Sequence, residues 1–325
     1  MRLLISGYGA APDVSVALYH DGKPVWTDGV EAPSFIVGGD GYLFAVTENE
    51  TFAAVHAYRE CAQGYAHTDS CRLEGGLLCH LSYSAAWRRL LGACYETGNV
   101  FDVPFDPESG CFGKVHSLLQ TGESKSRAHS VLLHSAQNTV YSANIALDRI
   151  YCYRLNENGL CEEGFFSVPK GSGPRHLCFS ENEQLLYVIT EYSNEILVYS
   201  LPDGECRQRV STLPDGFAGR SNCSTLCFSK DCRFLYAANR FSDTIAVFEV
   251  QENGLLGVKS LFGCGGNNPR HMALSPDGSV LAVCCQDSDE VVFHTLDRQS
   301  GLPVKEDEKR IPFLMPAGIL WLQDQ

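Results

Sequence analysis

The sequence predicts an all-β fold, a seven-bladed β-propeller of four-stranded antiparallel blades, and two observations lead to this prediction. The first is a motif of three short apolar runs separated by polar turns, clearest over residues 173–199. Runs rich in β-branched and aromatic residues, bounded by polar turns, are typical of strands joined by hairpins. The second observation is that the motif recurs along the chain. A long, regular repeat with several strands in each copy is typical of β-propellers.

The repeat can be followed by one position near the start of each first strand. The equivalent residues are Ser34, His80, Ser130, His176, Thr225 and His271. Their successive spacings are 46, 50, 46, 49 and 46 residues. Six copies therefore fill residues 33–296, and strand-like runs remain at 3–6, 14–19 and 317–322. We expect these terminal runs to share a seventh blade that closes the ring, so that residues 1–325 form a single domain.

The composition excludes several classes of function. The 325 residues include 25 basic and 39 acidic ones, and no basic run is present, which argues against a nucleic-acid partner. No apolar run is long enough to cross a membrane, and the N-terminus does not read as a secretion signal. The charged stretch 305–308 is expected to be a solvated loop.

The fifteen cysteines do not have the spacing of a zinc site, and several lie within strands where a small apolar residue would fit. Their odd number suits a reducing compartment. We therefore expect a cytoplasmic protein, a monomer or weak homodimer, that needs no metal and no cofactor.

Polar side chains stand at the ends of the innermost strands. Arg175 begins the first strand of the central motif and Glu191 ends the second, so an antiparallel hairpin places them side by side. The other repeats supply Glu48, His80, Tyr95, His129, Asn144, His176, Arg240, Arg270 and Gln286 at comparable places. Innermost strands line the central channel of a propeller, so we expect these groups to converge at its mouth. Any one of them could serve a turn, but turns favour Gly, Asn, Asp and Ser rather than Arg, His and Glu.

Four segments resemble the seven-bladed β-propeller lactonases, a family that includes propeller-type 6-phosphogluconolactonases and is similar to carboxy-cis,cis-muconate cyclases. The segments are Gly173-Pro174-Arg175-His176 with Glu191, Ala128-His129-Ser130-Val131, Leu235-Tyr236-Ala237-Ala238-Asn239-Arg240 with Ser242-Asp243, and Asn268-Pro269-Arg270 with Ser275-Pro276-Asp277-Gly278. The resemblance covers roughly residues 30–300. It implies that His129, Arg175, Glu191 and Arg240 are the active residues, with His80, Arg270 and Gln286 on the rim.

Three positions depart from the family pattern. Thr225 stands where the family commonly has an acidic residue, Arg127 where it has a second histidine, and Asn144 where it has an aspartate. Together these changes remove negative charge and add positive charge near the expected mouth. They favour a ligand that is more anionic or differently shaped, or a site that no longer hydrolyses phosphogluconolactone.

The resemblance implies a lactone hydrolase, most specifically one that converts 6-phosphoglucono-δ-lactone to 6-phosphogluconate. We expect Glu191 to activate water, because Arg175 beside it keeps it ionised, and His129 is the second candidate for this base. Arg175 and Arg240 would stabilise the oxyanion, and Arg270, or one of those two, would bind the anionic group. Two alternatives remain open: a muconate-type lactonising cycloisomerase, and a non-catalytic propeller that binds ligands or proteins.

Overall fold

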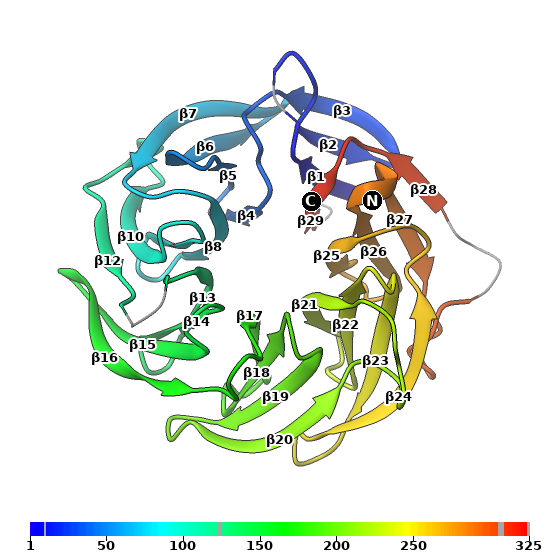
Figure 1. Ribbon diagram of the computed structural model, residues 1–325. Coiled ribbons are helices and arrows are strands. Elements are labelled where there is room, and N and C mark those ends of the chain that lie inside the picture. The colour runs from blue at the N-terminus through cyan, green and yellow to red at the C-terminus, as the bar shows by residue number, and fades with distance from the viewer. Residues whose placement is uncertain (10, 122–124, 305–308, 324–325) are drawn as a thin grey trace. The chain divides into compact units, whose positions relative to one another are not determined.

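The computed structural model describes residues 1–9, 11–121, 125–304 and 309–323, so the expected loop at 305–308 lies outside the described residues. Within these ranges the chain forms seven antiparallel sheets and one short 3₁₀ helix, η1 (Gln286–Ser288) (Figure 1). The predicted seven-bladed β-propeller is confirmed. No helix in the described ranges is long and apolar enough to span a membrane.

One sheet combines strands from both ends of the chain, as predicted. Its order is β29-β1-β2-β3. The strands are β29 (Pro316–Leu322), β1 (Arg2–Gly7), β2 (Val16–His20) and β3 (Lys23–Asp28). By their contacts the residues fall into two compact units, Ser6–Lys170 and Met1–Ile5 with Gly171–Gln325.

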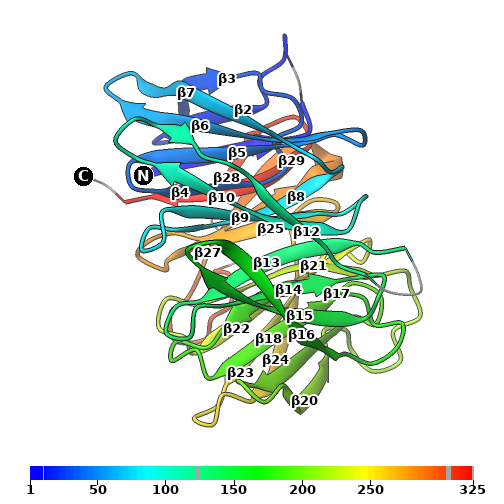
Figure 2. The same ribbon diagram turned by 90° about the vertical axis from the view of Figure 1, so that its left-hand side faces the viewer.

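The unit Ser6–Lys170 holds three further sheets, and in the first and third of them the strands follow in chain order (Figure 2). The first contains β4 (Ile36–Gly39), β5 (Tyr42–Glu48), β6 (Ala53–Cys61) and β7 (Gly64–Leu73). The second contains β8 (Leu78–Ser84), β9 (Arg89–Cys94), β10 (Asn99–Asp106), β11 (Cys111–Phe112) and β12 (His116–Leu119). The third contains β13 (Ala128–His134), β14 (Thr139–Asn144), β15 (Arg149–Asn156) and β16 (Gly159–Ser167). In the second sheet, both β11 and β12 pair with β10, so two short strands share the outer position.

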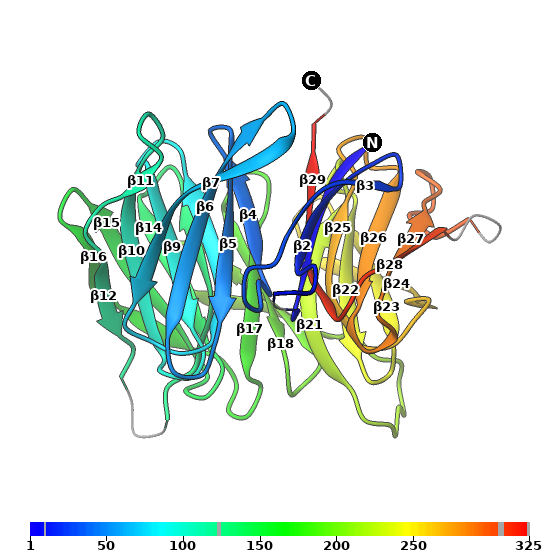
Figure 3. The same ribbon diagram turned by 90° about the horizontal axis from the view of Figure 1, so that it is seen from above.

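The unit that contains Gly171–Gln325 also holds three complete sheets. The first contains β17 (Pro174–Phe179), β18 (Leu185–Thr190), β19 (Glu195–Ser200) and β20 (Glu205–Ser211). The second contains β21 (Asn222–Phe228), β22 (Phe234–Arg240), β23 (Thr244–Val250) and β24 (Leu256–Gly263). The third contains β25 (Pro269–Leu274), β26 (Val280–Cys285), β27 (Glu290–Thr295) and β28 (Lys309–Pro312), which Figure 3 shows from above.

The second strand of each sheet lies in the core and is almost wholly buried. In β18 every residue after Leu185 is buried. A continuous apolar run is typical of a strand covered on both faces, whereas a half-exposed strand alternates. The aromatic rings of Phe44 and Phe105 illustrate the packing between sheets, with their centroids 4.8 Å apart in an edge-to-face arrangement.

Three core tyrosines bind a neighbouring sheet of their own unit through the hydroxyl group. Tyr42, Tyr187 and Tyr236 each lie on a second strand, and each donates a hydrogen bond to a backbone carbonyl 65 or 67 residues further along the chain. The acceptors are the carbonyls of Pro107, Gly254 and Gly301, at 3.0, 2.6 and 2.9 Å. These bonds satisfy a polar atom that would otherwise be unpaired in the core.

A β-bulge marks the start of the first strand in five sheets. The pairing with the second strand shifts register there, and the residues between the paired positions are Cys79, His129, Arg175, Ser224 with Thr225, and Arg270. A bulge turns a side chain away from the regular alternation and is frequent beside active sites. In β4 the pairing is regular and the strand begins at Ile36, so Ser34 precedes the strand rather than lying in it, as the repeat had suggested.

Candidate active site

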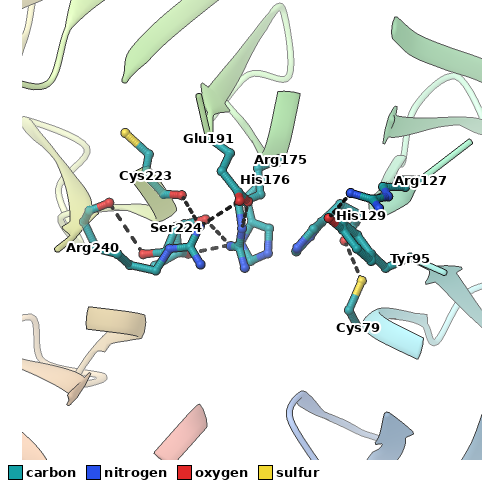
Figure 4. Close-up of polar contacts among 12 residues, drawn as sticks. Cys79, Tyr95, Arg127, His129, Arg175, His176, Glu191, Cys223, Ser224 and Arg240 are labelled. Atoms are coloured by element: carbon teal, nitrogen blue, oxygen red, sulfur yellow. Dashed lines mark hydrogen bonds and ion pairs between the residues drawn. The ribbon is translucent and has the colours of Figure 1, made fainter. Parts of the chain in front are cut away.

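An ion-pair cluster forms in the unit that contains Gly171–Gln325. Arg175 lies in the bulge of β17, Glu191 is the first residue after β18, and Arg240 ends β22. The Glu191 carboxylate contacts both arginines, with Oε2 3.1 Å from Arg175 Nε and Oε1 3.0 Å from Arg240 Nη2 (Figure 4). The predicted contact between Arg175 and Glu191 is therefore present, and a second arginine completes it.

Backbone carbonyl groups hold the two guanidinium groups in place. Arg175 Nη1 donates to the carbonyl oxygen of Ser224, and Arg240 Nη2 donates to that of Cys223 at 3.3 Å. The backbone N–H of Cys223 in turn donates to the carbonyl oxygen of Glu191 at 3.2 Å. The start of β21 thus supplies acceptors to both arginines. The types of residue at these positions do not predict contacts with backbone carbonyl groups, so the sequence analysis did not anticipate them.

Burial and charge act against each other at Glu191. Arg175 is 2% exposed, Arg240 is 8% exposed, and the Glu191 side chain is 16% exposed. Burial alone would raise the pKa of the Glu191 carboxyl, but the charges of Arg175, Arg240 and Arg270 outweigh it and lower that pKa below its ordinary value of 4.5. Glu191 is therefore ionised at neutral pH. Two guanidinium groups contact this one carboxylate, which leaves the cluster with an excess of positive charge.

One donor of this cluster is left without a partner. The Nε atom of Arg240 is buried and makes no hydrogen bond with any described residue. A buried, unpaired donor normally costs free energy, so such atoms often belong to binding sites. The excess of positive charge and the unused donor both suit an anionic or carbonyl-bearing ligand.

Arg270 and His271 are adjacent residues of β25. Arg270 lies half-buried in the bulge of β25, and the next residue, His271, accepts a hydrogen bond at Nδ1 from the backbone N–H of Ile319 at 3.3 Å. Burial, followed by the charges of Arg175 and Arg270, lowers the pKa of His271 to about 4. His271 is therefore a neutral hydrogen-bond acceptor at physiological pH.

His176 and Gln286 belong to the same unit. His176 is buried, and its Nδ1 lies 3.2 Å from the hydroxyl oxygen of Thr225, the residue that replaces an expected acidic one. Gln286 lies in η1 rather than at the end of β26, because the chain turns into the helix directly after Cys285. Its Oε1 is buried and has no hydrogen-bond partner among the described residues.

A second polar group forms in the unit Ser6–Lys170 from Tyr95, Arg127 and His129 (Figure 4). Arg127 Nη1 donates to the Tyr95 hydroxyl at 2.9 Å, and its guanidinium carbon lies 4.9 Å from the centre of the same ring. The Tyr95 ring meets His129 edge-on, with centroids 5.8 Å apart. His129 is almost fully buried in the bulge of β13. The arginine that departs from the family pattern is therefore held beside the histidine that matches it.

Asn144 has a different environment from the one we expected. Its side chain is completely buried, and Oδ1 accepts hydrogen bonds from the backbone N–H groups of Arg127 and Leu147, at 3.1 and 3.2 Å. Its Nδ2 donates to Gln120 at 2.7 Å and to Ser126 at 2.8 Å. Asn144 thus holds the segment that carries Arg127, and its expected contact with a ligand stays a prediction.

The two other predicted residues lie in the same unit. His80 is half-buried, stacks against Phe35 with ring centroids 4.4 Å apart, and accepts a hydrogen bond at Nδ1 from the backbone N–H of Val131 at 3.5 Å. Glu48 accepts a hydrogen bond from the Tyr8 hydroxyl at 2.9 Å. The structure therefore brings together Glu191 and its arginines, and separately Tyr95, Arg127 and His129. That all of them meet at one channel mouth stays a prediction.

The described residues contain no group of three or more His, Cys, Asp or Glu side chains placed to hold a metal ion. The chemistry available in the cluster is that of an ionised carboxylate and several charged hydrogen-bond donors. Such donors stabilise negative charge that develops on an oxygen atom during acyl transfer.

Comparison with known proteins identifies the family. Residues 22–321 match the family model described as "Lactonase, 7-bladed beta-propeller". A 6-phosphogluconolactonase of Bacillus subtilis is 32% identical over 240 residues, which cover 70% of this chain and 69% of the relative.

Solved structures agree with this match. The periplasmic gluconolactonase PpgL of Pseudomonas aeruginosa superposes with a TM-score of 0.91 at 25% identity, over 98% of both chains. A protein of Lactobacillus plantarum shares the fold, with a TM-score of 0.89 at 20% identity over 99% of both chains. The chain belongs to the lactonase family of seven-bladed β-propellers.

Proposed function

We propose that the protein hydrolyses a sugar lactone that carries an anionic group, specifically 6-phosphoglucono-δ-lactone, to give 6-phosphogluconate. The observation that supports this most is the cluster in which two arginines, Arg175 and Arg240, contact the single carboxylate of Glu191. Its excess positive charge suits a substrate that is itself negative and becomes more so in the transition state. Family membership supports lactonase activity on sugar lactones, and the relative from Bacillus subtilis bears the name of this enzyme.

In the proposed reaction Glu191 takes a proton from water while the water oxygen attacks the lactone carbonyl carbon. General-base assistance of this kind typically contributes about 10²- to 10⁴-fold in rate. The carbonyl oxygen becomes an oxyanion, which Arg175 and Arg240 stabilise. Collapse of the tetrahedral intermediate breaks the ring C–O bond, and the alkoxide leaving group takes up the proton. At neutral pH the carboxylic acid product then releases one proton to solution.

A carboxylate between two arginines is a weak base, although it is fully ionised. His129 is therefore retained as the alternative base, since a neutral imidazole can accept a proton from water. Arg270 is proposed to add positive charge to the Glu191 cluster rather than to act on the reacting bond.

Proton release in weak buffer tests the proposal, with the spontaneous rate of each lactone subtracted. The substrates are 6-phosphoglucono-δ-lactone, glucono-δ-lactone and a muconolactone. We expect turnover of the phosphorylated lactone, and a large loss of turnover in Arg175→Lys, which keeps the charge but not the forked donor geometry. Turnover of the muconolactone alone would favour the cycloisomerase. No turnover of any lactone would favour a non-catalytic binding protein.

We further propose that the protein acts in the cytoplasm as a monomer or weak homodimer, without a nucleic-acid or membrane partner. None of its fifteen cysteines forms a disulfide in the structure, which suits a reducing compartment. A sedimentation measurement that finds a stable larger assembly would contradict the expected oligomeric state.

A further inference from the structure

Three exposed aromatic side chains lie on, or next to, the segments that carry the Glu191 cluster. Four aromatic side chains of the described residues are exposed, and three of them are Tyr192 (45%), Phe217 (39%) and Phe241 (38%). Tyr192 follows Glu191 directly, and Phe241 follows Arg240 directly. Phe217 lies in residues 212–221, the loop that leads into β21. Apolar surface beside a few polar groups is typical of a small-molecule site.

Phe241 is held in an unusual conformation. Its φ of 68° lies in the left-handed region, which is costly for a bulky residue and persists mainly where the surroundings impose it. The Arg220 guanidinium carbon lies 3.6 Å from the centre of the Phe241 ring, and that of Arg240 lies 5.9 Å from it. A hydrogen bond of 3.1 Å between the hydroxyl groups of Ser221 and Ser242 joins the loop to this turn. The Phe241 ring is thus close to both an exposed arginine and an arginine of the ion-pair cluster.

The charge of Arg220 is not neutralised by the protein. Unlike Arg240, which contacts Glu191, Arg220 is exposed and forms no ion pair with a carboxylate in the described ranges. Its backbone position is nevertheless fixed, because the carbonyl oxygen of Ser221 accepts a hydrogen bond from Asn194 Nδ2 at 3.1 Å. A fixed, unpaired cation on an aromatic ring is suited to bind an anion.

The geometry also fits the length of the proposed substrate. The guanidinium carbons of Arg220 and Arg240 can be no farther apart than the sum of their distances to the Phe241 ring centre. In the δ-lactone the carbonyl carbon C1 and C5, which carries the C6 phosphate, flank the ring oxygen, so the carbonyl and the phosphate arm project from the same side of the sugar ring. With the carbonyl at Arg240, the C6 arm can extend past Phe241 and bring the phosphate to Arg220.

We propose that Arg220 and Phe241 form the subsite that recognises the distal phosphate of the substrate. Phe241 supports the Arg220 guanidinium and contacts the sugar carbons with the part of its ring that stays exposed. Arg220 binds the phosphomonoester with charged hydrogen bonds. The inference rests on the proposed function and adds the residues that distinguish a phosphorylated lactone from a neutral one. Neither residue takes part in breaking the ester bond.

The variant Arg220→Gln tests the phosphate contact. We expect its KM for 6-phosphoglucono-δ-lactone to rise about tenfold or more, as for the loss of a charged hydrogen bond. Its kcat, and its KM for glucono-δ-lactone, should stay within about twofold of the parent.

Arg233→Gln is the matched control. Arg233 is also exposed and also lies over an aromatic ring, 5.2 Å from the centre of Phe234. It precedes β22, whereas Arg240 ends that strand, so the two residues are on the order of 20 Å apart. The control should leave both KM values unchanged. Equal effects of Arg220→Gln on both lactones, or none on either, would overturn the phosphate contact while leaving the lactonase intact.

A binding measurement separates failure of the subsite from failure of the proposed function. Titration calorimetry with 6-phosphogluconate, the product, needs no turnover. Tighter binding of 6-phosphogluconate than of gluconate, lost in Arg220→Gln, would support the subsite even if neither lactone were hydrolysed. Equal binding of the two sugar acids by the parent protein would overturn it.

Phe241→Asn tests the contact with the sugar carbons, because asparagine tolerates the left-handed conformation. Relief of backbone strain should leave the melting temperature unchanged or higher, while KM rises for both lactones. If Phe241 were only structural, the variant would melt earlier with unchanged KM, and that result would contradict this contact.

Discussion

Glu191 is the residue on which the proposed chemistry depends. Its two oxygens contact Arg175 and Arg240, and the charges of these arginines outweigh the burial that would raise its pKa. A group whose pKa is lowered by folding stabilises the protein above its unfolded-state pKa, and this stabilisation is lost as the pH falls through the folded-state pKa. Removing one member of a buried ion pair typically costs about 3–5 kcal/mol. Glu191 therefore stabilises the fold as well as providing a candidate base.

The pH dependence of kcat/KM distinguishes the two candidate bases. If Glu191 activates water, kcat/KM should be constant from about pH 5 to 8 and fall only in the acid range, where the lowered pKa of Glu191 lies. The measurement is initial proton release or lactone loss at a series of pH values, corrected for spontaneous hydrolysis. Glu191→Gln should lose most of the activity. A decline within the range from about pH 5 to 8 would contradict this assignment and favour His129 as the base.

At the scale of single elements, the hairpin was predictable and the bulge was not. The apolar runs of β17 and β18 and the polar turn between them fix an antiparallel pair, which alone places Arg175 beside Glu191. The bulge that turns Arg175 inward follows from the backbone path and has no residue signature. The same holds for the carbonyl groups of Cys223 and Ser224 that hold the arginines.

Gly173 sets the entry of the chain into that bulge, and Gly173→Ala should disturb the site. Its φ is 65°, an added Cβ would lie 2.6 Å from Cδ2 of Tyr192, and its carbonyl accepts the backbone N–H of Glu191 at 2.7 Å. We expect a loss of stability greater than about 1 kcal/mol. We also expect a lower kcat/KM, because the segment that positions Arg175 and Glu191 must shift.

Gly171→Ala is the matched control for this prediction. Gly171 also has a positive φ, 79°, but an added Cβ would meet no atom within 4 Å. It should cost only the backbone term of about 1 kcal/mol and leave kcat/KM unchanged. Denaturant unfolding and the lactonase assay measure both effects. Equal losses of activity in the two variants would show that contact with Tyr192 is unimportant.

At the scale of the whole molecule, the repeat was the strongest signal. Six copies at nearly constant spacing predicted seven sheets and the one that combines β1 with β29, because each blade repeats the same turn chemistry and apolar runs. The division of one outer position between β11 and β12 was not predicted, since outer strands are exposed and follow no apolar pattern. Arg220 and Phe241 were missed for a related reason. They lie in a loop and a turn, outside the strands that the repeat identifies.

The net charge likewise says little about the site. The chain has a net charge of −14, yet the Glu191 cluster contains more guanidinium groups than carboxylates. Arg175 and Arg240 are buried, whereas most acidic side chains of the described residues are not. Total charge describes solubility and long-range attraction, whereas recognition depends on the few groups that face the ligand.

The free cysteines lead to a prediction about the intact protein. Fifteen thiols should react with a thiol reagent in denaturant, without prior reduction. Two fewer would show a disulfide and contradict a reducing compartment. The first pair to examine would be Cys264 and Cys285, whose sulfur atoms lie 3.9 Å apart in the core.

The most direct test of the account is the effect of Arg240→Gln on hydrolysis of 6-phosphoglucono-δ-lactone, beside the Arg233→Gln control and with folding checked by circular dichroism. Removing an oxyanion donor should lower kcat/KM by about 10²- to 10³-fold, whereas the control should stay within about twofold of the parent. That result would establish that the Glu191 cluster carries out the reaction. A folded Arg240→Gln protein with undiminished activity would contradict the account.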